Sequence, residues 1–203
     1  MRFPVRVDGG HRWVLHVGGK SAALRNAVVG QGFHCRIVDG PDITLGTRYA
    51  LLPVIADVRQ NRVMGLVLTP PRGPEIQKMF CRLARVAATS SVPWILLVPA
   101  SAVSSIVKEL ESLDEYKTFD AIIEQCAYGA NHRGSLRIIA GSLDIDDCSR
   151  LRLRCNGRGS LCPYTNRPHG AGQAYGGVNL PTDLARDLAH VILAPTRCEV
   201  LNV

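Results

Sequence analysis

Hydrophobic and polar residues alternate along most of the chain in two kinds of block. Short apolar runs predict buried strands, and longer segments with apolar residues every three or four positions predict helices. The clearest helix is expected over 74–89, where Ile76, Met79, Phe80 and Leu83 recur at helical spacing. Strands are predicted at 13–17, 33–38, 63–68, 94–98, 119–124 and 136–140, and the other helices at 22–29, 48–59, 101–113 and 184–193.

This alternation predicts an α/β fold: a Rossmann-like, mostly parallel sheet with helices on both faces. A length of 203 residues with 46% hydrophobic side chains suits one domain spanning 1–203. Periodicity is lost over 142–175, which we expect to be a Cys/His-containing C-terminal insert. The apolar runs are too short to cross a bilayer. The first six residues lack the apolar part of a signal peptide, so we expect an intracellular protein of the cytoplasm or nucleus, not a secreted one.

A Gly18-Gly19 turn separates the first predicted strand from the first helix, and Asp39 ends the second strand. In open α/β sheets, ligands bind at this edge, because glycine lets backbone approach them closely. Asp39 would then accept hydrogen bonds from a ribose. A glycine turn is also needed when no ligand binds, so both interpretations stay open. A P-loop is disfavoured because Val14 stands where its first glycine is required.

Several of the seven cysteines crowd into the later part of the chain, and a histidine follows them. A closed tetrahedral zinc site needs four ligands. Cys155, Cys162 and His169 supply three, and either Cys126 or Cys148 supplies the fourth. We prefer Cys126, because it follows a core strand, whereas Cys148 follows three aspartates and is expected to be solvated. The spacing lacks the tight knuckle of zinc fingers, so unligated thiols are the alternative.

Charge is distributed unevenly along the chain, whose formal net charge is +7. Residues 131–170 carry seven arginines, no lysine and three acids. Guanidinium groups bind phosphate in a bidentate manner, so this segment predicts contact with nucleic acid, with a solvated basic face as the alternative. The arginines expected to form one surface are Arg133, Arg137, Arg150, Arg152, Arg154, Arg158 and Arg167.

The order of these motifs resembles a family of methyltransferase-like proteins of eukaryotic mobile elements and viruses, related to DNA (cytosine-5) methyltransferases. The segments that carry the resemblance are 17–21, Asp39, the Pro-Pro loop at 69–76, 97–101, 124–129 and 155–169. The resemblance implies a site for S-adenosylmethionine at Gly18, Gly19, Asp39 and Pro70.

The chain departs from this family at the reactive positions. Arg72 stands where the attacking cysteine of the Pro-Pro loop is expected, and Leu97-Val98-Pro99 replaces the Glu-Asn-Pro strand end. Lys20 adds a positive charge beside the glycine turn, so S-adenosylmethionine is expected to bind weakly or not at all. The sequence therefore predicts a pseudoenzyme that binds nucleic acid or a protein partner. The alternatives are an active S-adenosylmethionine-dependent methyltransferase acting on nucleic acid, and a structural subunit of a larger assembly.

Overall fold

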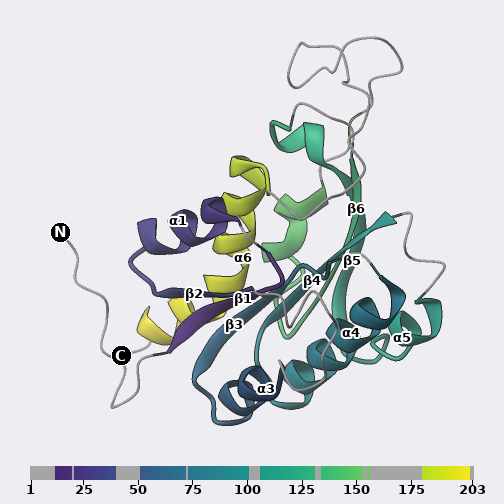
Figure 1. The fold of residues 1–203 in the computed structure, drawn as a ribbon. Coiled ribbons are helices and arrows are strands. Elements are labelled where there is room, and N and C mark those ends of the chain that lie inside the picture. Colours follow the sequence, from purple (N-terminus) through teal and green to yellow (C-terminus); the bar gives the residue numbers. More distant parts are fainter. Residues whose placement is uncertain are drawn as a thin grey trace.

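A six-stranded sheet lies at the centre of the molecule, and helices pack against it (Figure 1). The computed structural model describes residues 12–19, 21–39, 51–71, 73–100, 106–130, 134–152, 155 and 180–201. The strands are β1 (Trp13–Val17), β2 (Cys35–Val38), β3 (Val63–Leu68), β4 (Trp94–Pro99), β5 (Lys117–Glu124) and β6 (Ser135–Gly141). The helices are α1 (Ala22–Gly30), α3 (Leu52–Arg59), α4 (Pro74–Thr89), α5 (Val107–Glu111) and α6 (Thr182–Leu201), with 3₁₀ turns η3 (Gln125–Tyr128) and η4 (Asp147–Arg152).

The strand order is β2-β1-β3-β4-β6-β5. The first four strands are parallel, but β6 runs antiparallel to both of its neighbours, β4 and β5. The sheet is therefore mixed. The pairings among β1 to β4 are parallel, as expected, whereas both pairings of β6 are antiparallel. The physical reason is the short connection between β5 and β6, because neighbouring strands joined this closely pair as a hairpin.

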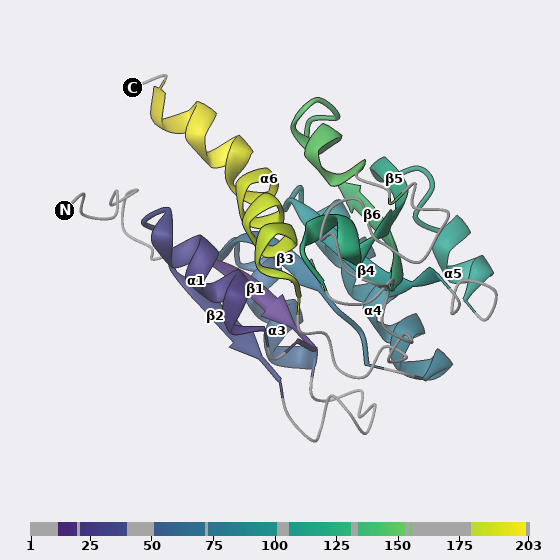
Figure 2. The ribbon, with the colours of Figure 1, turned by 90° about the horizontal axis from the view of Figure 1, so that it is seen from above.

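The helices cover both faces of the sheet, as predicted. Seen from above, α1 and α6 lie on one side, and α3, α4 and α5 lie on the other (Figure 2). Central strand β4 is buried along its whole length, which explains its uninterrupted apolar sequence. Gly65 lets α6 approach β3 closely, because a Cβ atom there would collide with the Ile192 side chain.

Most helix boundaries follow the expected signals, with three differences. The helix expected over 101–113 is limited in its described part to α5, because Ile106 is not helical and residues 112–116 form turns. The helix expected over 48–59 has its described part at Leu52–Arg59, and Pro53 lies in its first turn, where a missing N–H is tolerated. The last helix runs on to Leu201 with Pro195 inside it, beyond the expected end at residue 193. Among the described helices, none combines the length and the apolar character needed to cross a bilayer.

Candidate functional site: a glycine turn and a Cys-Cys-Glu cluster

The glycine turn and the Pro-Pro loop lie side by side at the carboxyl edge of the parallel strands. Val17 pairs with Leu68, and the Thr69 amide donates a 3.0 Å hydrogen bond to the Val17 carbonyl. The Gly18 amide donates to the Val38 carbonyl at 2.9 Å, which brings Asp39 to the same edge. The prediction that these turns share one edge is confirmed. Gly18, Gly19, Asp39 and Pro70 all lie at this edge, whereas Lys20 and Arg72 fall outside the described residues.

Both glycines of the turn make room for side chains of the protein itself. Gly18 has a φ of +83°, and a Cβ atom on it would lie 2.5 Å from the Thr69 carbonyl oxygen and 2.8 Å from the Phe80 ring. A Cβ atom on Gly19 would collide with the His16 ring and lie 2.5 Å from Thr69 Oγ1. Internal packing therefore accounts for these glycines without any ligand.

His16 and Thr69 form a buried polar pair beneath this turn. Thr69 Oγ1 donates to the Val17 carbonyl at 3.3 Å and lies 2.9 Å from His16 Nε2. Both contacts of Thr69 Oγ1 are satisfied when it donates to Val17 and accepts from His16 Nε2–H; His16 Nδ1 is then a buried acceptor with no hydrogen-bond partner among the described residues. Burial lowers the pKa of His16 to about 4, although Asp39 acts in the opposite direction. The imidazole is therefore neutral at pH 7.

The described residues of the loop after β3 offer few groups that could take part in a reaction. Thr69 is fully buried, and its hydroxyl faces His16 and Val17. Pro70 is also buried. At the end of β4, Leu97, Val98 and Pro99 are buried apolar residues, so this strand end offers no carboxylate to a base. The described residues here resemble packing elements more than a reaction centre.

A second feature at the same edge brings two cysteines and a glutamate together. Glu124 ends β5, Cys126 lies in η3, and Cys155 reaches them from much later in the chain. The carboxylate and the two Sγ atoms all lie within 4.8 Å of one another. Cys126 is 1% exposed and Cys155 is 4% exposed. Two thiolates and a carboxylate are donors that suit Zn²⁺.

Local backbone structure holds this cluster in place. The Gln125 amide donates to the Gly134 carbonyl at 2.8 Å, closing the base of the β5–β6 hairpin. Gly129, with a φ of +87°, ends η3 in the left-handed conformation that favours glycine. The Tyr128 hydroxyl donates to the Arg150 carbonyl at 3.1 Å, which joins η3 to η4. These bonds bring the hairpin end and the following segment together at the cluster.

Of the four expected zinc ligands, two lie within the described residues and two lie outside them. Cys126 and Cys155 meet, whereas Cys162 and His169 lie outside the described residues. Glu124 was not expected as a ligand; the only signal was its position two residues before Cys126.

The expectation that Cys148 is solvated was wrong. Cys148 is fully buried in the apolar core with Phe119 and Leu151, and the cluster around Glu124 does not include it. The physical reason is η4, which directs this side chain towards the core, whereas Asp144 and Asp146 are exposed and Asp147 is half-buried. Burial, assisted by Asp147 and Asp144, raises the pKa of the Cys148 thiol to about 11. Cys148 therefore behaves as a small apolar residue.

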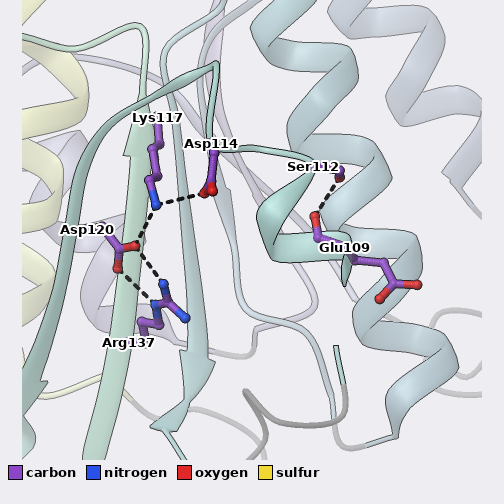
Figure 3. Close-up of polar contacts among 6 residues, drawn as sticks. All are labelled: Glu109, Ser112, Asp114, Lys117, Asp120 and Arg137. Carbon is purple, nitrogen blue, oxygen red and sulfur yellow. Dashed lines mark hydrogen bonds and ion pairs between the residues drawn. The ribbon is translucent and has the colours of Figure 1, made fainter. Parts of the chain in front are cut away.

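The described arginines of the predicted basic surface have different surroundings. Arg137 donates to Asp120 through Nε at 2.9 Å and Nη2 at 2.7 Å, and Lys117 bridges Asp114 and Asp120 (Figure 3). The charge of Arg137 is thus compensated within the hairpin. Arg150 and Arg152 are exposed, and the Arg152 guanidinium lies 5.4 Å from the centre of the Phe119 ring. The other four arginines, Arg133, Arg154, Arg158 and Arg167, lie outside the described residues.

The glycine turn and the Cys-Cys-Glu cluster are separate places on one edge. Three strands lie between β1 and β5, so the two features are roughly 19 Å apart at the usual strand spacing. A metal in the cluster would therefore not touch a ligand at the glycine turn. In comparisons with known proteins, no family model, no curated protein and no solved structure matches this chain.

Proposed function

We propose that the chain is a methyltransferase-like module that binds nucleic acid and lacks cytosine-5 methyltransferase activity. The observation that carries this proposal is the inward orientation of Thr69, at the start of the loop where the resemblance expects reactive groups. A catalytic side chain has to reach the reacting atoms. Thr69 is fully buried, and its hydroxyl is already hydrogen-bonded to the protein.

The topology supports the Rossmann-like part of this proposal. Strand order reverses at β1, because the chain goes first to β2 on one side and then to β3 on the other. Such a switch point is the usual ligand crevice of doubly wound sheets.

Zinc has a structural role in this proposal. Cys126 and Cys155 are two ligands, and Cys162 and His169 are the expected others. Glu124 lies within reach either as a ligand or as the carboxylate that orients a ligating histidine. A closed set of four protein ligands leaves no position for substrate, so the ion ties the segment around Cys155 to the end of β5 and does no chemistry.

Nucleic acid is the partner that the charge distribution favours. The chain carries a formal net charge of +7, and Arg150 and Arg152 are exposed beside the proposed zinc site. Guanidinium groups bind phosphates, and such binding weakens steeply as salt rises. A protein partner would show a weaker dependence on salt, which separates the two.

Three measurements on one purified sample of the full chain test this function. We expect about one zinc per chain by elemental analysis, no heat of binding with S-adenosylmethionine, and salt-dependent binding of oligonucleotides. Micromolar affinity for S-adenosylmethionine would place the active methyltransferase first. Absence of oligonucleotide binding even at low salt would contradict the nucleic-acid role.

A further inference from the structure

A group of arginines gathers at the amino-terminal edge of the sheet, opposite the glycine turn. The Trp13 amide donates to the Arg62 carbonyl at 3.2 Å, and the Val14 amide donates to the His34 carbonyl at 2.9 Å. These bonds bring the starts of β1, β2 and β3 together. The arginines that this arrangement places near one another are Arg12, Arg36, Arg59 and Arg62.

A single carboxylate serves two of these arginines. Asp57 accepts hydrogen bonds from Arg36 Nη1 at 3.2 Å and from Arg62 Nη1 at 3.5 Å. The Asp57 side chain is only 14% exposed, whereas both arginine side chains are 57% exposed. Two cations thus share one anion, and much of each guanidinium faces solvent. The edge therefore carries a positive charge that the described residues do not compensate.

A cavity of about 420 Å³ opens beside these arginines. Its described lining consists of Trp13, His34, Cys35 and Arg36. The Cys35 side chain packs against the α1 and α6 face of the sheet, opposite to the face on which Trp13 packs, and burial raises the pKa of its thiol to about 11, so it adds no negative charge at pH 7. The cavity thus combines a half-buried aromatic side chain with an exposed guanidinium group, and its volume falls in the range of ordinary small-ligand sites.

We propose that this cavity and its arginines bind a nucleotide unit of single-stranded nucleic acid, with the base against Trp13 and the flanking phosphates on Arg36 and Arg62. Aromatic stacking combined with a basic surface is the usual means of holding single strands. Single strands are favoured over duplex because only an unpaired base can leave its stack and enter a cavity. The inference rests on the proposed nucleic-acid function and assigns it a surface different from the one that the sequence predicted.

The test is a titration of the full chain with a fluorescein-labelled single-stranded 12-mer, followed by anisotropy at several salt concentrations. The Arg36→Ala/Arg62→Ala variant should lose at least tenfold in affinity. The slope of log K against log salt should fall by about 1.4, as two lost phosphate contacts predict for a single strand. Arg82→Ala, which removes an exposed arginine from α4, is the matched control and should bind as the unmodified chain does.

Two further variants separate a binding role from a structural one. Asp57→Asn should raise the affinity severalfold, because it frees both arginines, whereas mere structural damage would lower it. Trp13→Leu should weaken binding and remove the preference for single strand over duplex. Unlabelled 12-mer should quench the Trp13 emission, and Trp13→Leu should leave only the emission of the buried Trp94, unaffected by the ligand.

The possible failures are distinguishable. If the unmodified chain binds no 12-mer at low salt, the proposed nucleic-acid function fails and the inference fails with it. If the chain binds, but only the Arg150→Ala/Arg152→Ala variant is weakened, the function stands and this inference is wrong. Equal affinity for a polyglutamate peptide would show a general anion surface and would also overturn it.

Discussion

His16 Nε2 and Thr69 Oγ1 lie 2.9 Å apart and join the ends of two neighbouring strands beneath the glycine turn. Both side chains are fully buried, so the bond forms away from competing water. It fixes the rotamer of Thr69, and it keeps the imidazole against the backbone of Gly19. Such sheets usually bind ligands at this edge, but here the polar groups of His16 and Thr69 beneath the turn are hydrogen-bonded to each other.

Removing the Thr69 hydroxyl should destabilise the fold. Thr69→Val keeps the shape but leaves His16 Nε2–H buried without an acceptor, which costs about 1–3 kcal/mol. Urea denaturation at pH 7 measures the change. Thr118→Val, at an exposed position of β5, is the control and should alter the free energy of unfolding by less than about 0.5 kcal/mol. Equal effects of the two substitutions would contradict the importance of the pair.

Acid should weaken the fold through His16. The pKa of this residue is lowered by burial to about 4 in the folded chain, against about 6.5 when unfolded, so the unfolded state binds more protons between these values. The contribution is present above pH 6.5 and is lost as the pH falls towards 4, by roughly 3 kcal/mol. His16→Gln keeps an N–H donor but does not titrate. The difference between the two unfolding curves over pH 4–7 should show this loss, and parallel curves would refute it.

Gly19 and Gly30 should differ in how substitution by alanine changes the stability of the fold. Gly19→Ala places a methyl group against His16 and Thr69, and such overpacking costs roughly 1–3 kcal/mol. Gly30→Ala, at the end of α1, meets no atom within 4 Å and should be neutral or stabilising by up to about 1 kcal/mol. Thermal melts of both variants test this. A tolerated Gly19→Ala would mean that the turn has more space than the contacts indicate.

Cysteine substitutions should separate the metal cluster from the core. Cys126→Ser and Cys155→Ser should each lose zinc after dialysis against a weak chelator, because each removes a thiolate. Cys148→Ala should keep its zinc, since this thiol is buried in the apolar core away from Glu124. Elemental analysis of the three variants gives the answer. Zinc loss from Cys148→Ala with the fold intact would make Cys148 a ligand after all.

The pair of Asp120 and Arg137 should stabilise the hairpin modestly. Although burial of Asp120 acts in the opposite direction, hydrogen bonds from Arg137 and Lys117 lower the pKa of this carboxyl. Both side chains of the pair are about one quarter exposed, so solvent screening limits the effect of Asp120→Asn to about 1 kcal/mol. Asp183→Asn breaks the more exposed pair with Arg186 and should change little. Urea denaturation of both variants tests this ranking, and equal losses would contradict it.

Sequence patterns located the elements well but not their directions. β3 and α4 begin and end where expected, because Pro70 and Pro74 mark the local boundaries. The direction of β6 was missed, since an apolar run reads the same in either orientation. Glu124 was missed because a carboxylate at a strand end normally indicates solvent, and only the return of the chain at Cys155 gives it another role. Contacts between residues so far apart in the sequence cannot be recognised from local periodicity.

The position of β6 also determines which part of the sheet can unfold separately from the rest. β5 pairs only with β6 among the described strands, and β6 joins the parallel strands through β4 alone. The hairpin can therefore detach as a cooperative unit while β1 to β4 stay folded. Because Glu124 ends β5 and Cys126 lies in the following turn, a metal held by this cluster would be released by the partial opening and not only by global unfolding. Amide hydrogens of β5 and β6 would then exchange with solvent long before those of β1 and β3, and proteases would first cut here.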